Sequence, residues 1–248
     1  MKPLFSIITV TYNAAGTVER TLRSVASQTC TLYEHIIVDG ASRDDTLAIV
    51  AAAPASERRR VISEPDRGLY DAMNKGLGMA RGDYLIFLNA GDKFHSPDTL
   101  QLIADRIMAA DYPGIVYGQT NLVDDRGDYV GPRHLTAPES LTYRDFARGM
   151  LVCHQAFVVL RRIAPYYDLS YRFSADYDWC VQCLQHSRRN VYAGDVLIDY
   201  LSEGLTTANR RASLLERYRI MCRYYGTVST TLRHVGFLLR DLRRKLKK

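Results

Sequence analysis

Four short apolar runs lie within the first ninety residues, and a cluster of polar residues follows each of them. Runs of this length with polar boundaries are typical of buried strands. In open parallel sheets ligands bind outside the carboxyl ends of the strands, so polar tips on successive strands indicate one shared site. The runs are 5–10, 35–38, 60–63 and 84–88, and their tips are Thr11-Tyr12-Asn13, Asp39, Glu64-Pro65-Asp66 and Asn89-Ala90-Gly91-Asp92.

Segments with helical spacing separate these runs. Residues 17–28 carry Val18, Leu22 and Val25 at three- and four-residue steps, which predicts a helix with one apolar face. Further helices are expected over 44–53, 70–80 and 97–109. Strand and helix thus alternate in units of about 25 to 30 residues, which predicts an α/β fold with a doubly wound, mostly parallel sheet and right-handed crossovers.

The second half of the chain has a different pattern. Residues 115–123 and 129–130 flank the turn sequence Asp-Asp-Arg-Gly-Asp, which predicts a hairpin. The strand-like segments 152–160 and 191–200 enclose a helix that begins near Ala175. We expect a mixed half that continues the first domain, because no linker separates the two.

The composition is that of a globular protein with reduced thiols. Of 248 residues, 47% are hydrophobic and 24% charged, and no apolar stretch approaches the roughly 20 residues that a membrane-spanning helix needs. The N-terminus enters a strand-like run without the features of a signal peptide, which predicts a cytoplasmic protein. The five cysteines are odd in number and scattered, which argues against a disulfide framework.

Positive charge is concentrated at the C-terminus. Residues 231–248 contain seven basic residues and one acid, and this excess of +6 equals the formal net charge of the whole chain. A neutral body with one basic tail and no recognisable nucleic-acid module argues against nucleic-acid binding. Leucine and valine recur at three- and four-residue steps from 232 to 246, so we expect a basic amphipathic helix on an anionic membrane surface. The alternative is that this helix packs on the protein body or on a second copy in a homo-oligomer.

Two common phosphate-binding motifs are missing. A dinucleotide-binding fold needs a glycine-rich turn after its first strand, but residues 11–16 contain one glycine, and no Gly-Lys-Ser/Thr loop occurs. Carboxylates at strand tips remain, which can bind a base or ribose, or hold a divalent cation that neutralises a diphosphate. Asp39 and Asp92 are best placed for this, although an acid at such a position can also cap the following helix.

The ordered motifs along the chain resemble those of family 2 glycosyltransferases, which have a GT-A fold. Within that family the chain is similar to the branch of bacterial exopolysaccharide and colanic-acid-type transferases. The resemblance is dense over residues 4–100 and sparser to about 210. The motifs that carry it are residues 9–13, 38–46, 64–76 and 87–92, followed by 154–157, 174–177 and 204–207.

The resemblance implies a donor site at the strand tips. Val10, Thr11, Tyr12 and Asp39 would hold the nucleotide base, and Asn74 and Lys75 would lie near the ribose or diphosphate. Asp92 would bind Mn²⁺ or Mg²⁺. The family pattern at this tip is Asp-x-Asp-Asp, whereas this chain has Asn89, Ala90 and Gly91 before Asp92, so one carboxylate is left to bind the metal together with diphosphate oxygens and water.

The resemblance also implies a catalytic base. Asp176 matches the family's base, although Ala175 replaces the customary preceding Glu. Asp178 is a rival, and an acid in the first helical turn can also simply stabilise the helix dipole.

Two further predictions have open alternatives. His154 is either a metal or phosphate contact or a core histidine. Arg210 and Arg211 either close over the diphosphate as a cationic lid or lie in solvent at a helix start.

Together these features predict an inverting, metal-dependent glycosyltransferase. It would move a sugar from a nucleoside-diphosphate donor to a saccharide, carried on a polyprenyl-diphosphate-linked intermediate of surface polysaccharide synthesis. Residues 1–110 would bind the nucleotide sugar, 111–210 would hold the acceptor and the base, and 211–248 would attach peripherally to the cytoplasmic face of the inner membrane. The alternatives are a non-catalytic nucleotide-sugar or polysaccharide-binding protein on the same fold, and a nucleic-acid-binding protein acting through the basic tail.

Overall fold

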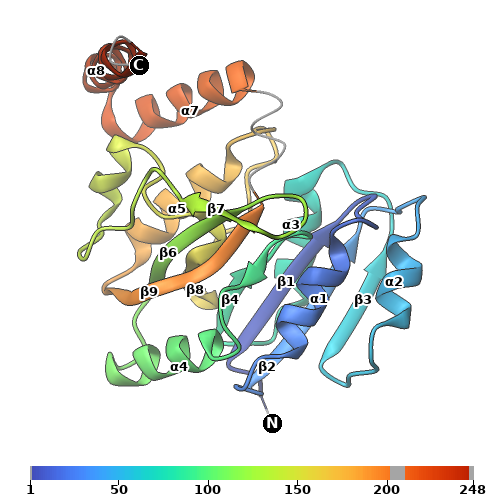
Figure 1. Ribbon diagram of the computed structural model, residues 1–248. Helices are drawn as coiled ribbons and strands as arrows, with labels where there is room; N and C mark the ends of the chain where they lie inside the picture. The colour runs from blue at the N-terminus through green and yellow to red at the C-terminus, as the bar shows by residue number, and fades with distance from the viewer. Residues whose placement is uncertain (1, 202–209, 246–248) are drawn as a thin grey trace.

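Four parallel strands form the first half of the sheet. A computed structural model describes residues 2–201 and 210–245, and Figure 1 shows these strands beneath helices α1 and α2. Their order across the sheet is β3-β2-β1-β4. The strands are β1 (Phe5–Thr11), β2 (Tyr33–Asp39), β3 (Arg59–Ser63) and β4 (Tyr84–Phe87). Every residue of β1, β2 and β4 is buried, because helices cover both faces of this part of the sheet.

The second half extends the same sheet with strands of both directions, so that the described residues form a nine-stranded sheet. β8 (Phe157–Leu160) pairs antiparallel with β4, and β6 (Ile115–Val123) lies between β8 and β9 (Asn190–Leu201). β5 (Lys93–Phe94) closes the far edge, and β7 (Tyr129–Pro132) forms the expected hairpin with β6. The predicted mixed second half is therefore confirmed.

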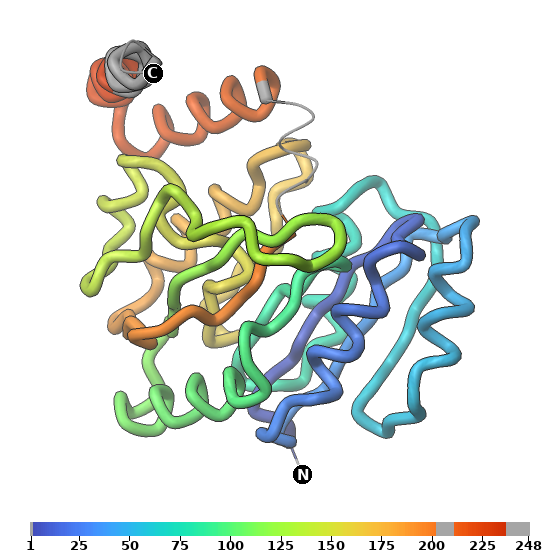
Figure 2. The backbone as a smooth tube through the Cα atoms, in the orientation of Figure 1, coloured from blue at the N-terminus to red at the C-terminus, as the bar shows by residue number. Residues whose placement is uncertain are grey.

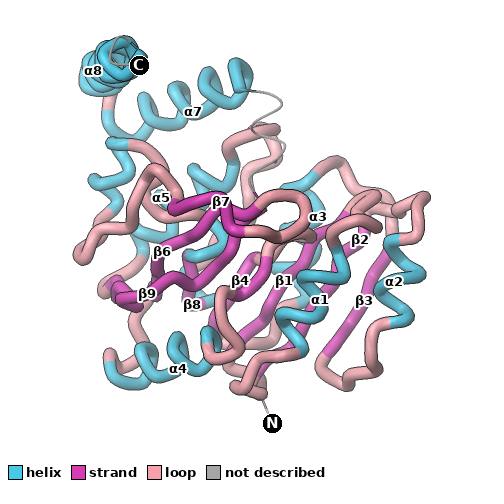
Figure 3. The backbone as a smooth tube through the Cα atoms, in the orientation of Figure 1, coloured by secondary structure: helices cyan, strands magenta, loops and turns pink. Residues whose placement is uncertain are grey.

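Helices pack on the two faces of the sheet, as Figure 3 shows. One face carries α1 (Val18–Ala26), α2 (Thr46–Ala52) and α4 (Thr99–Ala109), whose apolar residues pack on the sheet in two clusters. The other face carries α3 (Leu69–Met79) and α5 (Ala175–His186), which share the largest apolar cluster. The 3-10 turns are η1 (Tyr143–Arg148), η2 (His154–Ala156) and η3 (Arg161–Ile163).

One strand is shorter than its apolar sequence predicts. Residues 152–160 were expected to be a continuous strand, but β8 begins at Phe157 and turn η2 precedes it. The amide of Ala156 donates to the carbonyl of Cys153 at 3.0 Å, and the Cys153 thiol donates to the side chain of Gln155. These local bonds replace the sheet pairing at this point, so His154 lies in a turn rather than in a strand.

Helices α7 (Arg210–Tyr225) and α8 (Thr227–Lys245) complete the described part of the chain. α7 packs against the face that carries α3 and α5, since Ile220 and Met221 are buried in the largest apolar cluster. The chain turns sharply between the two helices (Figure 2), and Gly226 has a φ of 80° there. In the described residues no helix combines the length and the apolar character needed to cross a membrane.

Candidate active site

The sheet order places a topological switch point between β1 and β4, and we call the region at the carboxyl ends of these strands the crevice. The chain winds outward from β1 to β3 and then returns to place β4 on the other side of β1. Connections leave the two central strands in opposite directions at such a switch point, and ligands bind in the opening. The tips remain joined by one hydrogen bond, from the amide of Ala90 to the carbonyl of Val10 at 3.3 Å. The predicted donor residues of the first and fourth tips therefore lie side by side.

Two polar atoms at this crevice are buried and lack a hydrogen-bond partner. They are the hydroxyl oxygen of Thr11 and the amide oxygen of Asn89. Thr11 is only 5% exposed, so water does not readily satisfy its hydroxyl. A buried polar group without a partner costs about 1–3 kcal/mol, and such groups mark places where a ligand or ordered water completes the structure.

An exposed aromatic ring lies beside the tip of β2. Tyr12 is 62% exposed, although most large apolar side chains nearby are buried. A Cβ placed on Gly40 would lie 3.3 Å from the Tyr12 ring and 2.5 Å from the Asp66 carboxylate, so these three residues lie close together. An aromatic face next to a carboxylate acceptor suits a nucleotide base, which can stack on the ring and donate a hydrogen bond.

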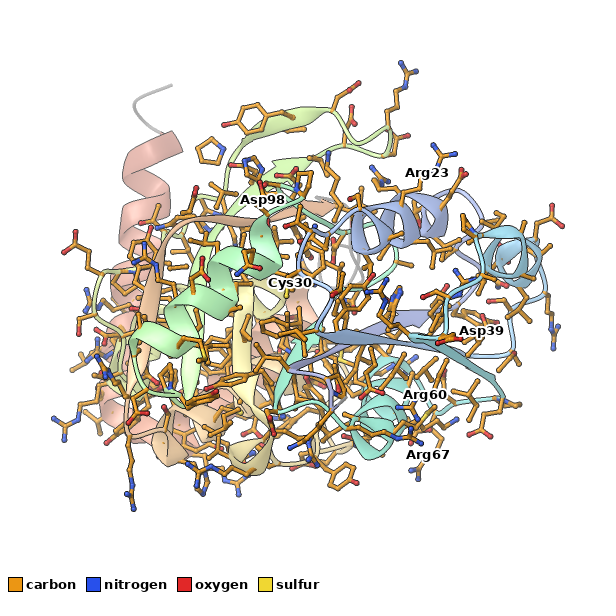
Figure 4. All side chains as sticks on the ribbon, turned by 90° about the horizontal axis from the view of Figure 1, so that it is seen from below. Arg23, Cys30, Asp39, Arg60, Arg67 and Asp98 are labelled. Atoms are coloured by element: carbon orange, nitrogen blue, oxygen red, sulfur yellow. The ribbon has the colours of Figure 1, made fainter. Side chains whose placement is uncertain are left out.

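Asp39 faces inward. It is completely buried, and its carboxylate accepts hydrogen bonds from the Ser42 amide at 2.9 Å, the Ser42 hydroxyl and the Ser63 hydroxyl at 2.7 Å. In Figure 4 it lies between the helix layer marked by Arg23 and the layer marked by Arg67. Asp39 therefore ties the loop after β2 to β3. Its direct contact with a nucleotide stays a prediction.

Asn74 and Lys75 both hold neighbouring loops. Asn74 pairs with the backbone of Tyr167 through two hydrogen bonds, of 3.0 Å and 2.7 Å. Lys75 donates to the carbonyl of Pro65 at 2.8 Å and pairs with the Glu64 carboxylate at 2.9 Å. The proposed contacts of these residues with the ribose or diphosphate stay predictions.

Asp92 lies in the wall of the crevice, only 3% exposed. Its Oδ1 accepts the amide of Leu201, at the end of β9, at 2.9 Å, and the side chain of Gln155 also bonds to the carboxyl group. Burial raises the pKa of Asp92 to about 7, while these two bonds and the charge of Arg20 act in the opposite direction. Asp92 is therefore a carboxylate that a nearby positive charge would ionise readily.

The geometry of Gly91 explains why Asp92 has no second carboxylate beside it. Gly91 has a φ of +103°, a conformation that residues with a side chain rarely adopt. A Cβ there would lie 2.8 Å from the Leu201 side chain. Its amide also donates to the Thr21 hydroxyl at 2.9 Å, which fixes the turn. An acid at this position would have to adopt this unfavourable φ and displace the Leu201 side chain.

The donor atoms at this tip fit a divalent cation. The Asp92 carboxylate and the unpartnered Asn89 oxygen are both oxygen ligands, which Mg²⁺ and Mn²⁺ prefer. Within residues 2–201 and 210–245, no three His, Cys, Asp or Glu side chains form a group that could hold a metal. The residues therefore suit a cation that arrives with a diphosphate supplying further ligands.

His154 belongs to an aromatic cluster in the core. Its Nε2 lies 2.7 Å from the Tyr167 hydroxyl, and its ring packs against Phe87 and Trp179. Burial lowers the pKa of His154 to about 4, so the ring is neutral at pH 7. This geometry favours the core alternative for His154, and a role as metal ligand stays a prediction.

The surroundings of Asp176 differ from those of Asp178, the other candidate for the base. Asp178 is buried and accepts hydrogen bonds from the Tyr224 hydroxyl at 2.8 Å and the Gln182 amide at 2.6 Å. Asp176 is only partly buried, and its Oδ1 accepts the Tyr70 hydroxyl at 3.1 Å and the Tyr177 amide at 2.9 Å. In the described part of the chain, both of these bonds use Oδ1 and none is given to Oδ2. Of the two acids, Asp176 is the more exposed.

The charges of Asp92 and Asp176 act on the same two side chains. Burial raises the pKa of Cys153 to about 11, and the charges of both aspartates contribute to the rise. The pKa of Tyr200 is also raised, first by burial and then by the charges of Cys153, Asp92 and Asp176. The predicted cation-binding acid and the predicted base are therefore both within electrostatic range of Cys153 and Tyr200.

Sequence reasoning missed the residues that support these two acids. Tyr70 stood inside the motif at 64–76, and Gln155 inside the motif at 154–157, but nothing in their spacing marked which acid each would contact. The motif at 204–207 lies outside the described residues. The same holds for the side chain of Arg210, at the first position of α7, while Arg211 is exposed.

Comparison with known proteins agrees with this geometry. Residues 6–164 match the model of glycosyl transferase family 2. A PGL/p-HBAD biosynthesis glycosyltransferase of Mycobacterium bovis is 35% identical over 190 residues, which cover 74% of this chain and 71% of the relative.

Two solved structures show the same fold. The S. aureus TarS fragment 1–349 with UDP-GlcNAc is 18% identical, with a TM-score of 0.72 over 96% of this chain and 73% of that chain. The mannosyltransferase PcManGT of Pyrobaculum calidifontis, in complex with GDP-Man and Mn²⁺, is 16% identical, with a TM-score of 0.62 over 95% of this chain and 75% of that chain. Compared with the TarS fragment 1–349 in complex with UDP, this chain spans 64% of the length of the fragment. The predicted α/β GT-A fold is confirmed, and the chain belongs to glycosyltransferase family 2.

Proposed function

We propose that this protein is an inverting glycosyltransferase that uses a nucleoside-diphosphate sugar and builds a cell-surface glycan or glycolipid. The main support is the membership of the chain in glycosyltransferase family 2, together with one acid at the tip of β4, Asp92, and a partly exposed acid at the start of α5, Asp176. Asp92 would serve the leaving diphosphate, and Asp176 would serve the hydroxyl of the incoming acceptor. A protein that only binds a nucleotide sugar needs no such second acid.

The donor would bind across the tips of β1, β2 and β4. The Tyr12 ring offers a stacking surface for the base, and Asp66 offers an acceptor beside it. The buried hydroxyl of Thr11, at the tip of β1, lacks a partner and would bond to the nucleotide. Asp92 and Asn89 would hold Mn²⁺ or Mg²⁺, and such a cation supplies Lewis-acid stabilisation of the departing diphosphate.

Asp176 would act as the base. The acceptor oxygen attacks the anomeric carbon from the face opposite the diphosphate, the bond from that carbon to the diphosphate oxygen breaks, and the hydroxyl proton passes to the free oxygen of Asp176. Tyr70 and the Tyr177 amide occupy Oδ1, so the carboxylate is held with Oδ2 available. A single base is sufficient, because the diphosphate leaves as an anion that needs no proton.

We propose further that the acceptor is lipid-linked and that α8 binds a membrane surface. Val228 is 76% exposed and Leu232 is 69% exposed, one helical turn apart, and both line one open hollow together with Arg233. Leu215 on α7 is 62% exposed as well. Exposed apolar residues next to basic residues suit the interface of an anionic bilayer, where each basic residue contributes about 1 kcal/mol.

The test is turnover with UDP, GDP and dTDP sugars in the presence of Mn²⁺ and a lipid-linked saccharide. We expect one donor to be consumed with transfer to the acceptor, and both Asp176→Asn and Asp92→Asn to lower the rate at least a hundredfold, about 2.7 kcal/mol in activation free energy. Tight nucleotide binding without turnover of any donor would instead support the non-catalytic alternative. Transfer that proceeds fully without Asp176 would overturn the proposed mechanism.

A further inference from the structure

A carboxylate from α7 holds the backbone immediately before α5. Oε1 of Glu216 accepts the amide of Arg172 at 2.8 Å, and Oε2 accepts the amides of Phe173 at 2.7 Å and Ser174 at 3.0 Å. Three successive backbone donors thus converge on one side chain that is 42 to 44 residues away in the sequence. Bonds from N–H groups to a carboxylate are stronger than bonds between neutral groups.

A second contact joins the N-terminus of α5 to α7. Ser174 is the N-cap residue of α5, yet its side chain makes no capping bond to α5. Its hydroxyl instead contacts the carbonyl and the hydroxyl of Ser213 on α7, both at 3.1 Å. The first turn of α5 is therefore attached to α7 rather than closed by its own N-cap.

The same turn carries Asp176, two residues after Ser174. Asp176 is bonded to Tyr70 on α3, so the position of its carboxylate depends on how the start of α5 lies relative to α3. Tyr70, which bonds to Asp176, is also influenced by Glu216: burial raises the pKa of Tyr70, and the charges of Asp176 and Glu216 raise it further. A base displaced by about 1 Å can lose about a hundredfold in rate.

We infer that Glu216 is a positioning residue that sets the orientation of the catalytic base through the backbone of residues 172–174. This inference rests on the proposed function. It makes α7 part of the active-site architecture, and it gives Glu216 a role that neither donor nor acceptor contacts would reveal.

A purely structural role for Glu216 would have a different signature. Loss of a structural contact lowers thermal stability and reduces the fraction of folded enzyme, but the folded molecules keep their kcat. Loss of a positioning contact lowers kcat in fully folded enzyme and leaves the KM for the donor unchanged, because the donor crevice lies at the strand tips and not at α5.

The experiment compares Glu216→Gln with Glu57→Gln, a matched removal of one carboxylate at an exposed position. Glutamine has the shape of glutamate but keeps one acceptor oxygen, so it can satisfy only part of the three-amide contact. We expect Glu216→Gln to lower kcat about tenfold and to change the donor KM less than about twofold. Hydrogen exchange should accelerate at the amides of 172–174, and Glu57→Gln should match the unaltered protein in all three measurements.

A double variant decides whether the effect passes through the base. With Asp176→Asn already present, adding Glu216→Gln should lower the residual rate by less than about twofold, because a missing base cannot be misplaced. Full additivity, or an unchanged kcat in Glu216→Gln, would overturn the inference while leaving the proposed function intact. If Glu216→Gln fails to fold, Glu216→Asp serves in its place with the same comparisons. An unaltered protein that transfers no sugar would overturn both proposals.

Discussion

The hydroxyl of Tyr70 donates a hydrogen bond to Oδ1 of Asp176 at 3.1 Å and so joins the start of α3 to the start of α5. Tyr70 is 6% exposed, and its ring stacks on Tyr167 at a centroid distance of 5.7 Å. The Tyr70 hydroxyl is therefore fixed in place before any substrate binds. Because it donates to Oδ1, it favours one orientation of the Asp176 side chain.

Removing that hydroxyl is expected to affect catalysis more than folding. Tyr70→Phe keeps the ring stacking and removes one hydrogen bond, so we expect kcat to fall about fivefold, which is about 1 kcal/mol. Steady-state kinetics measure this loss, and Tyr166→Phe, at an exposed position, is the control. Equal kcat values for Tyr70→Phe and the unaltered protein would contradict the role given to this contact.

Asp92 is expected to make the metal-free protein less stable as the pH rises. Its pKa is about 7 in the fold and about 3.9 in an unfolded chain, so the folded state holds the extra proton between these values. The contribution of Asp92 to the free energy of unfolding is therefore fully present below about pH 4 and is lost as the pH rises through about 7. Buried His35 and His154, with pKa values of about 3 and about 4, act in the opposite direction over the same range. The total slope therefore does not isolate Asp92.

A comparison of Asp92→Asn with the unaltered protein isolates the contribution of Asp92 to stability. Asp92→Asn cannot ionise, so relative to the unaltered protein it should gain about 2 kcal/mol in free energy of unfolding between about pH 5 and pH 7.5. Urea titrations in the presence of a chelator measure this difference, with Asp105→Asn on the exposed face of α4 as the control. Curves that stay parallel over this range would mean that Asp92 is ionised throughout.

Gly91 is expected to tolerate no side chain. Gly91→Ala would place a methyl group 2.8 Å from Leu201 and force a φ of +103° on alanine. We expect a loss of about 2 kcal/mol or more in free energy of unfolding, from strain and overpacking together. Gly236→Ala in α8 is the matched control, since a Cβ there meets nothing within 4 Å, and it should be neutral or slightly stabilising. Chemical denaturation compares the two, and a Gly91→Ala protein as stable as the control would refute the tight turn.

The exposed apolar face of α8 is expected to bind anionic membranes. Leu232→Gln removes a side chain that is 69% exposed, so it should not affect folding, yet it should weaken binding to vesicles at least tenfold. Burying a leucine contributes about 2 kcal/mol. Co-sedimentation with vesicles of phosphatidylglycerol and phosphatidylcholine measures this, and Met108→Gln on α4, also strongly exposed, is the control. Equal loss in both variants, or no binding by the unaltered protein, would argue that α8 covers another protein surface instead.

The sequence predicted the parallel half of the fold because each of its signals is local. Apolar runs and their polar tips mark β1, β2 and β4 within a few residues, and helical spacing marks α1 and α3. The shared position of the tips followed from a general rule of sheet topology. Signals of this kind need no knowledge of distant parts of the chain.

The hydrogen-bond partners and the exposure of each acid could not be predicted, because they depend on residues that are distant in sequence. Asp178 is occupied by Tyr224, and Asp92 by the amide of Leu201, which lies 109 residues away. Tertiary contacts of this kind do not show in a local pattern. The turn at His154 was missed for a different reason: its apolar neighbours have the composition of a strand, but local bonds at Cys153 and Gln155 bend the chain.

Trp179 is the sole tryptophan of the chain, and it lies on α5 with its ring stacked on Tyr167 at 5.1 Å. Its indole nitrogen donates to the carbonyl of Pro165, which fixes the buried ring on the helix that begins just before Asp176. Intrinsic fluorescence excited at the red edge therefore comes from one fluorophore at one known place. A shift in that emission on adding donor or acceptor would report a change in the surroundings of α5, without a label.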